Sequence, residues 1–249
     1  TILNDLPLFW DPEALASGYY SNVFRRDLPS RFALVPRHGS TEDIRWFEAD
    51  PTFVLHWTNA YEDGDEVVLD GFFQYNPTAR GVDRSVYVDP KQKGFETLDM
   101  NVLQARHHRW RFNLVTGKTR EGPLSETCSE FPMINGQHWG RPYRYSYNAL
   151  CAHGIFAFNG LVKHDVETGA ETFWHAPEGT FVSETVVAPR LGSTAEDDAY
   201  LLTFSCDMVN DESHCEIFDA VDPAAGPIAR VKLPECISWG SHATWALVS

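Results

Sequence analysis

Residues 53–73 read FVLHWTNAYEDGDEVVLDGFF, and the fold prediction starts from this stretch. Two apolar runs, residues 53–57 and 67–73, flank a polar turn at residues 62–65. The Asp63-Gly64 pair in that turn supplies the positive φ that a tight hairpin connection requires. The stretch therefore predicts a β-hairpin.

The same strand–turn–strand pattern recurs further along the chain, in residues 110–119, 161–172 and 217–231. The turn glycines Gly117, Gly169 and Gly226 are spaced by a little more than the roughly 40–50 residues of a four-stranded propeller blade. Regular strands with turns are also compatible with a β-sandwich, but the repeat favours blades. Only residues 12–16 and 99–104 suggest helix. We expect an all-β chain, three or four blades of a β-propeller, with residues 1–249 forming part of one domain without an internal boundary.

Composition narrows the class of protein. The 249 residues carry 20 Lys and Arg against 35 Asp and Glu, a net charge of -15, which disfavours nucleic acid as a partner. No apolar run reaches the roughly 18 residues of a transmembrane helix, although a peripheral membrane contact is left open. The five cysteines are odd in number and form no C-x-x-C pair, which fits reduced thiols in a cytoplasmic protein. The first residues, TILNDLPLFW, resemble the interior of a longer polypeptide.

Four residues are candidates for chemistry. His56 ends an apolar run just before a polar turn, and His242 lies close to the C-terminus in the segment WGSHATW. Glu130 and Glu184 lie in apolar segments, where a carboxylate requires a partner such as an imidazole N–H, a guanidinium or backbone amides. Each residue has a structural alternative. The histidines could be ordinary core or surface residues, and the glutamates could form ion pairs with a nearby arginine.

Six segments together resemble the carotenoid cleavage oxygenase family, and they occur in the order found in that family. They are residues 31–37 (RFALVPR), 56–62 (HWTNAYE), 130–135 (EFPMIN), 179–184 (GTFVSE), 196–202 (EDDAYLL) and 240–245 (GSHATW). The resemblance covers nearly the whole chain and corresponds to the C-terminal half of a family member.

The resemblance implies a seven-bladed propeller with an iron(II) on its axis, held by four histidines and supported by glutamates. By resemblance, His56 and His242 are the third and fourth iron ligands, and Glu130 and Glu184 are two of the glutamates that hold ligand imidazoles. Neutral imidazoles suit divalent iron, and four of them leave positions open for dioxygen and substrate. The implied reaction cleaves a conjugated carbon–carbon double bond of a carotenoid, apocarotenoid or stilbene into two carbonyl products.

The chain departs from the family in having about half an iron site. The first two ligand histidines of the family lie upstream of the part that this chain resembles, so the N-terminal half of the same polypeptide is the expected partner. His38 is the nearest candidate by position for a further ligand. The remaining histidines are interpreted as core or surface residues: His107, His108, His138, His153, His164, His175 and His214.

Two alternative functions stay open at this stage. One is a metal-free propeller fragment that serves as a binding or structural module, and the other is a relative that catalyses isomerisation with ester cleavage. A dry tunnel for the substrate requires an apolar lining. Aromatic residues could provide it or could simply form core: Trp57, Phe72, Phe73, Tyr75, Trp139, Tyr143 and Tyr147.

Overall fold

The computed structural model describes residues 1–18, 22–75, 77, 104–155, 157–238 and 240–246. Helix is confined there to short segments, namely α1 (Pro12–Ala16) and the single 3-10 turns η1 (Thr41–Asp43), η3 (Gly136–His138) and η4 (Pro223–Ala225). The helix predicted at residues 12–16 is confirmed. The one predicted at residues 99–104 lies outside the described residues except for Gln104, which is not helical.

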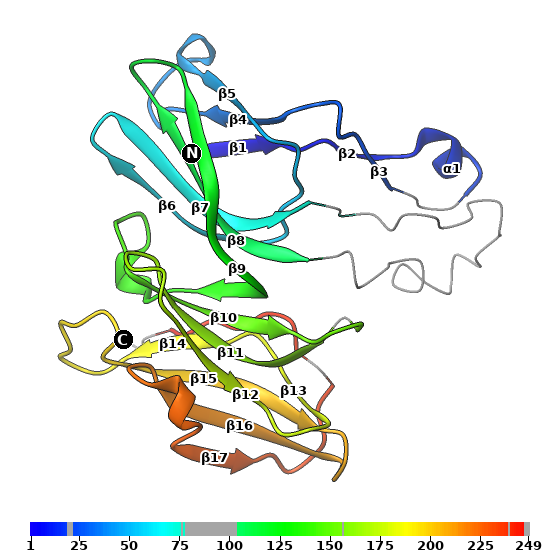
Figure 1. The fold of residues 1–249 in the computed structure, drawn as a ribbon, viewed down its shortest axis with the longest axis vertical. Coiled ribbons are helices and arrows are strands. Elements are labelled where there is room, and N and C mark those ends of the chain that lie inside the picture. The colour runs from blue at the N-terminus through cyan, green and yellow to red at the C-terminus, as the bar shows by residue number, and fades with distance from the viewer. Residues whose placement is uncertain (19–21, 76, 78–103, 156, 239, 247–249) are drawn as a thin grey trace.

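The strands form antiparallel sheets that follow one another along the long axis of the molecule (Figure 1). A three-stranded sheet contains β1 (Ile2–Asp5), β4 (Ser30–Leu34) and β5 (Arg45–Ala49), and a small ribbon contains β2 (Leu8–Trp10) and β3 (Asn22–Phe24). A seven-stranded sheet contains β6 (Trp57–Asp63), β7 (Glu66–Gln74), β8 (Ala105–Asn113), β9 (Thr119–Met133), β10 (Tyr145–Cys151), β11 (Phe158–Asp165) and β12 (Glu171–His175). The last sheet contains β13 (Thr180–Val182), β14 (Val186–Pro189), β15 (Ala199–Asp207), β16 (Glu212–Asp219) and β17 (Ala229–Lys232). The expected all-β propeller architecture is confirmed.

The seven-stranded sheet consists of two four-stranded blades that share strand β9. The first part of β9, from Thr119 to Cys128, pairs with β8, whereas its last part, from Ser129 to Met133, pairs with β10. The chain therefore passes from the β6–β9 blade to the β9–β12 blade within one strand. Separate sheets of four strands were expected, and the continuity of β9 is the reason that two of them are fused.

The hairpin predicted from residues 53–73 is present, with a shifted boundary. Strands β6 and β7 pair with Asp63 opposite Glu66, and Gly64 in the connection has a φ of 60°. The first strand begins at Trp57 rather than at residue 53, because Phe53 forms only an isolated bridge with Gln74 and is not part of the ladder. The three predicted repeat hairpins correspond to β8/β9, β11/β12 and β16/β17.

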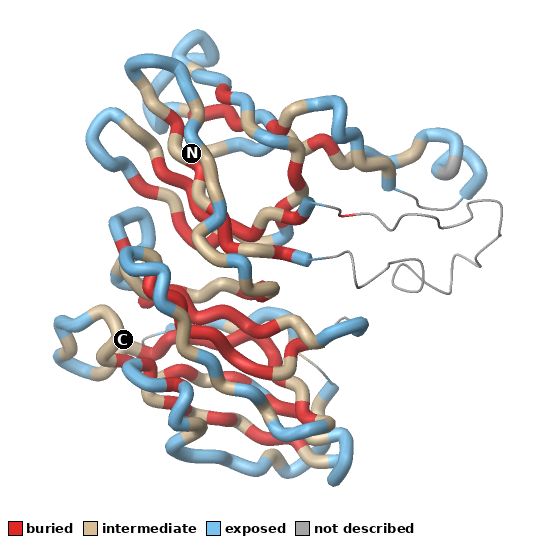
Figure 2. The backbone as a smooth tube through the Cα atoms, in the orientation of Figure 1, coloured by how far each residue is buried: buried red, intermediate tan, exposed pale blue. Residues whose placement is uncertain are grey.

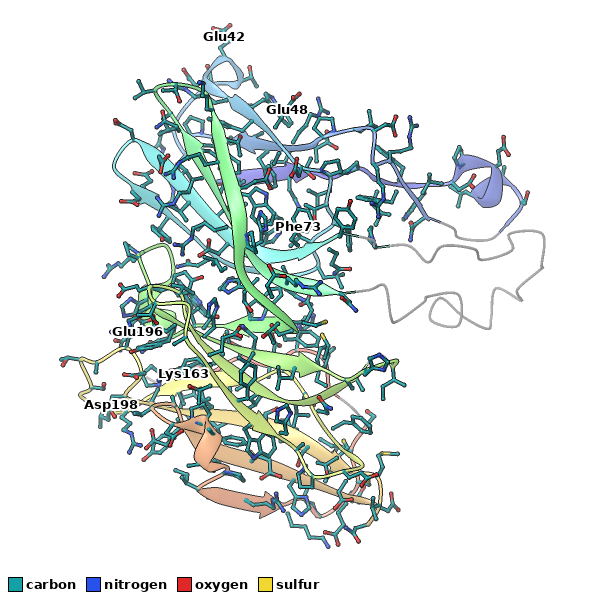
Figure 3. The ribbon with its side chains drawn as sticks, viewed as in Figure 1. Glu42, Glu48, Phe73, Lys163, Glu196 and Asp198 are labelled. Carbon is teal, nitrogen blue, oxygen red and sulfur yellow. The ribbon has the colours of Figure 1, made fainter. Side chains whose placement is uncertain are left out.

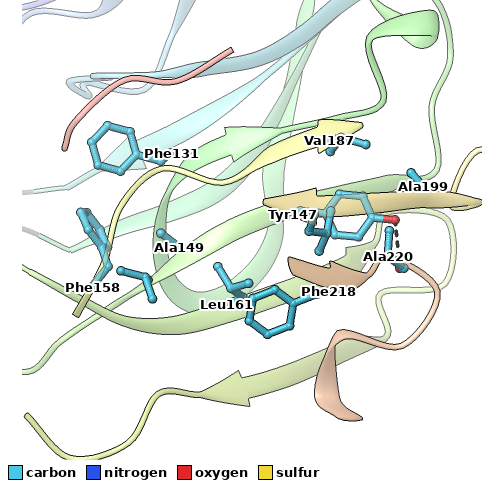
Figure 4. Close-up of a cluster of buried hydrophobic side chains, with 11 residues drawn as sticks. Phe131, Tyr147, Ala149, Phe158, Leu161, Val187, Ala199, Phe218 and Ala220 are labelled. Atoms are coloured by element: carbon cyan, nitrogen blue, oxygen red, sulfur yellow. Dashed lines mark hydrogen bonds between the residues drawn. The ribbon is translucent and has the colours of Figure 1, made fainter. Parts of the chain in front are cut away.

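Buried residues concentrate where neighbouring sheets face each other (Figure 2). The largest cluster joins the β9–β12 blade to the β13–β17 sheet and is shown in Figure 4. It contains Phe131, Tyr147, Ala149, Phe158, Leu161, Val182, Val187, Ala199, Leu201, Phe218 and Ala220. A second cluster, centred on Phe32, Trp110 and Phe112, joins the first sheet to the β6–β9 blade. Each blade thus buries an apolar face against its neighbour.

Polar contacts also join the sheets. Glu196, labelled in Figure 3, accepts hydrogen bonds from the backbone N–H groups of Arg144 and Tyr145, which lie at the start of β10. The ammonium group of Lys163 is 2.8 Å from a carboxylate oxygen of Asp197 and lies over the ring of Tyr145. These contacts bind the loop before β15 to the neighbouring blade.

One buried ion pair connects three segments. Asp70 on β7 is fully buried and accepts two hydrogen bonds from Arg109 on β8, at 2.8 and 2.7 Å. The hydroxyl of Tyr143, just before β10, donates a third hydrogen bond to Asp70, at 2.6 Å. Burial lowers the pKa of Arg109, but the hydrogen bonds and charge of Asp70 outweigh it and raise that pKa overall. Arg109 therefore stays protonated inside the protein.

Replacing Asp70→Ala should destabilise the protein by about 3–5 kcal/mol, because it leaves the Arg109 charge buried without compensation. Denaturant unfolding followed by tryptophan fluorescence measures the change. Asp63→Ala provides the matched control, since Asp63 forms an ion pair with Arg111 at a half-exposed position. That variant should lose less than about 1 kcal/mol. Equal losses in the two variants would contradict the role assigned to the buried pair.

Candidate metal centre

His56 and Glu130 form the first half of the site. His56 immediately precedes β6, and Glu130 lies on the part of β9 that belongs to the next blade. The Nδ1 atom of His56 is 2.6 Å from Oε2 of Glu130, a carboxylate that is only 6% exposed. The backbone N–H of Phe131 donates to the same oxygen at 2.8 Å. An ionised carboxylate only accepts, so Nδ1 of His56 carries the proton and Nε2 is left with a lone pair.

His242 and Glu184 form the second half in a similar way. Nδ1 of His242 is 3.3 Å from Oε2 of Glu184, and the backbone N–H of Ala243 donates to that oxygen at 2.7 Å. Glu184 lies in residues 183–185, which separate β13 from β14, so the glutamate stands outside both strands. The hydroxyl of Ser183 accepts a hydrogen bond from the N–H of Gly240, which fixes the C-terminal segment beside these residues.

The two imidazoles lie next to each other although 186 positions separate them in the sequence. Their ring centroids are 5.4 Å apart and their planes are inclined by 73°. With nitrogen–metal bonds of roughly 2.1 Å, two imidazoles about 110° apart on one metal ion have centroids about 5.3 Å apart. The hydrogen bonds of both rings to described residues use Nδ1, so the Nε2 atoms remain for a metal. The donor set therefore fits two ligands of one divalent ion.

Phe131 is the site residue that sequence reasoning did not single out. Its ring centroid is 4.7 Å from that of His56 and 5.7 Å from that of His242, so it packs against both imidazoles. Its backbone has a φ of 51°, which costs a residue with a side chain about 1–3 kcal/mol and is typical of functional sites. Its position directly after Glu130 was the only signal in the sequence, because a phenylalanine in an apolar strand predicts core.

The site raises the pKa of His56. Burial alone lowers that pKa, but the hydrogen bond and charge of Glu130, together with the charge of Glu184, outweigh burial. His242 differs in environment, since its side chain is 67% exposed. The site is thus closed on the His56 side and open on the His242 side among the described residues.

Other histidines lie in environments that do not require a metal. His107 and His164 are fully buried and 3.1 Å apart between their Nδ1 atoms, and His107 also contacts the hydroxyl of Thr58 through Nε2. Burial is the largest cause that lowers the pKa of each, so both stay neutral. His38 lies exposed in the turn between β4 and β5. In the described part of the chain, no group of three or more His, Cys, Asp or Glu side chains is arranged to hold a metal.

A pocket of about 310 Å³ is lined by residues that follow the site residues in the sequence. Three lining residues come from segments that also form the site. Ile134 follows Glu130, Val187 follows Glu184, and Trp245 follows His242. Trp139 is the one proposed tunnel aromatic that lines this pocket. Of the others, Phe72, Tyr143 and Tyr147 are buried core, Trp57 and Phe73 pack against core, and Tyr75 is 63% exposed.

None of the described helices is long and apolar enough to cross a membrane.

Comparisons with known proteins agree on one family. A family model described as retinal pigment epithelial membrane protein matches residues 1–247. Carotenoid 9,10(9',10')-cleavage dioxygenase 1 of Pisum sativum is 31% identical, over 98% of this chain and 46% of its own length. Apocarotenoid-15,15'-oxygenase of Synechocystis is 34% identical, over 90% of this chain and 44% of its own length. The chain therefore spans about half the length of the curated relatives it matches.

Solved structures give the same result. Cobalt-substituted ACO of Synechocystis superposes with a TM-score of 0.85 at 27% identity, over 99% of this chain and 51% of that one. Lignostilbene dioxygenase of Pseudomonas brassicacearum superposes with a TM-score of 0.80 at 25% identity, over 98% of this chain and 52% of that one. With the family model matching residues 1–247 and these relatives aligned over nearly its whole length, the chain belongs to the retinal pigment epithelial membrane protein family, that of the carotenoid cleavage oxygenases.

Proposed function

We propose that His56 and His242 are two ligands of a non-haem iron(II) centre in a dioxygenase that cleaves a conjugated carbon–carbon double bond into two carbonyl products. The observation that carries the proposal is the pairing of both Nδ1 atoms with buried carboxylates beside one another, at 2.6 and 3.3 Å. This arrangement presents two neutral imidazoles to one ion, which suits divalent iron. The substrate class, a carotenoid, apocarotenoid or stilbene, is taken from the named activities of the relatives.

Each site residue has a defined task in this proposal. Glu130 and Glu184 hold the Nδ1 protons, orient the rings and make each imidazole a better donor. Phe131 packs against both ligand rings and excludes water from one side of the ion. Bound iron would supply the activation of dioxygen. Neither carboxylate binds the iron directly in this proposal. The iron centre therefore keeps its positive charge, while the carboxylates hold the imidazole ligands in place.

The pocket of about 310 Å³ supports an apolar ligand. Its lining includes Met133, Ile134, Val186 and Trp245, with few polar groups to fix an orientation. A volume of about 310 Å³ is at the lower end for ligand pockets and would hold part of a long conjugated molecule. We propose that the other two iron ligands, and the rest of the substrate tunnel, belong to a part of the polypeptide outside these 249 residues.

The first test is iron content together with oxygen uptake. The complete polypeptide should bind one iron and consume dioxygen with a stilbene or an apocarotenal, whereas residues 1–249 alone should bind iron weakly. His56→Ala should lower iron affinity by more than the roughly 10–100-fold expected for a residue that only supports a ligand. Atomic absorption after dialysis and oxygen-electrode traces measure both quantities.

His175→Ala is the control for this test, because His175 is an exposed histidine that stacks on Phe173 at the end of β12. It should retain full iron and activity. Stoichiometric iron with turnover in residues 1–249 alone would contradict the division of the ligands, and normal iron in His56→Ala would contradict the ligand assignment itself.

The second test concerns the glutamates. Glu130→Gln keeps the size of the side chain but removes the negative charge that accepts from Nδ1 of His56 and from the backbone N–H of Phe131. This substitution should lower iron affinity or activity roughly 10–100-fold. Glu121→Gln is a matched control, since Glu121 accepts from Nε2 of His108 at 3.1 Å in a pair outside the site. If both variants lost iron equally, the effect would be general to Glu–His pairs and the specific role of Glu130 would be wrong.

The third test is pH dependence. Metal binds the neutral imidazole, so iron affinity should fall as the pH is lowered through the pKa of His56. Although burial opposes it, Glu130 holds that pKa above its ordinary value. In Glu130→Gln the pKa should drop, and the midpoint of the curve of iron affinity against pH should move to lower pH. An unmoved midpoint would show that His56 does not titrate in competition with iron.

A further inference from the structure

Two thiols face each other across strands β9 and β10, beside the candidate metal centre. The strands pair with Ala149 opposite Glu130 and Leu150 opposite Ser129. One step further in this register places Cys151 opposite Cys128. The two side chains also share a hydrogen bond, in which the thiol of Cys151 donates to the sulfur of Cys128.

Cross-strand neighbours in this position satisfy the distance that a disulfide requires. Directly opposite residues of an antiparallel pair have Cα atoms about 4.5–5.5 Å apart. A disulfide spans Cα separations of about 4.4–6.8 Å. Both cysteines are free thiols in the structure. Bond formation is therefore compatible with the pairing of the two strands.

The surroundings favour Cys128 as the reactive thiol. Arg106 on β8 is its partner on the other side of β9 and contributes positive charge. The pKa of Cys128 is lowered to about 7, and the hydrogen bond from Cys151 is the largest cause. Burial opposes this shift, whereas a backbone N–H and the charge of Arg106 add to it. Cys151 packs against the large apolar cluster, and the same hydrogen bond raises its pKa. Both residues are partly exposed, so a small oxidant can reach them.

We propose that Cys128 and Cys151 form a reversible disulfide when the protein meets a two-electron oxidant of the peroxide class. The Cys128 thiolate attacks one oxygen of hydrogen peroxide, the O–O bond breaks, and a sulfenic acid and water result. The Cys151 sulfur then attacks the sulfenic sulfur, the S–O bond breaks, the S–S bond forms, and a second water leaves. Overall, two thiols and one peroxide give one disulfide and two waters, and a dithiol reductant reverses the bond. This inference does not depend on the metal proposal.

A competing pair provides an internal comparison. Cys206 and Cys236 both lie near the hydroxyl of Ser213, at 3.9 and 3.5 Å from its oxygen. The hydroxyl contacts both sulfurs, whereas Cys128 and Cys151 contact each other directly. Cys215 has no such contact with another cysteine in the described part of the chain. Oxidation should therefore select Cys128 and Cys151.

The experiment is peptide mapping of the purified protein after brief treatment with hydrogen peroxide and alkylation of the remaining thiols. Trypsin should release residues 121–144 linked to residues 145–163, because Arg141 precedes a proline and resists cleavage. The linked pair should be about 2 Da lighter than the sum of its reduced peptides and should disappear after dithiothreitol. Cys215 should stay alkylated, as should Cys206 and Cys236.

Variants give a second readout. Peroxide should raise the midpoint of thermal unfolding of the wild-type protein, because the cross-link restricts the unfolded chain, and dithiothreitol should reverse the rise. Cys151→Ser and Cys215→Ser are matched variants, and only the first should abolish the rise. The proposal is overturned if Cys128 oxidises alone to a sulfinic acid in the wild-type protein, if Cys206 links to Cys236 instead, or if both thiols stay reduced. The mapping needs no variant, so it decides the question even if Cys151→Ser fails to fold.

Discussion

The pairing of β9 with two different neighbours is the constraint on which the rest of the structure depends. Because β9 bonds first to β8 and then to β10, it fixes the distance and angle between two blades. Glu130 lies just after the crossing, so its carboxylate reaches His56, which belongs to the preceding blade. Phe131 follows with a positive φ, which turns the strand where it meets the two imidazoles. The register between β9 and β10 shifts in this turn, between the Glu130 and Met133 pairs.

The site is assembled from irregular pieces of otherwise regular sheets. His56 stands just outside β6, Glu184 interrupts the chain between β13 and β14, and His242 lies in an irregular C-terminal segment. Regular strands satisfy their backbone groups within the ladder, whereas interruptions leave N–H groups that can bind a carboxylate. The N–H groups of Phe131 and Ala243 are used in this way. Irregular backbone thus lies at each of the segments that form the candidate site.

Buried polar groups elsewhere are paired with each other. Asp70, Arg109 and Tyr143 form a closed set in which each charge has a partner, and His107 and His164 are neutral imidazoles joined to each other. Such groups hold blades together through contacts with each other. The number of histidines in a sequence therefore says little about a metal centre. What distinguishes His56 and His242 is the pairing of Nδ1 with a carboxylate next to a second imidazole.

The sequence by itself determined the β class, the short helix at residues 12–16, the hairpin at Gly64 and the repeat hairpins, because turn chemistry and strand periodicity are properties of neighbouring residues. The family resemblance also pointed to His56, His242, Glu130 and Glu184. Only the tertiary structure decided that β9 joins two blades, that residues 183–185 separate β13 from β14, and that Phe131 packs against both imidazoles. The tertiary structure also decided that Cys128 lies next to Cys151. These features arise from contacts between segments distant in the chain, which depend on how whole apolar faces pack and leave no local pattern in the sequence.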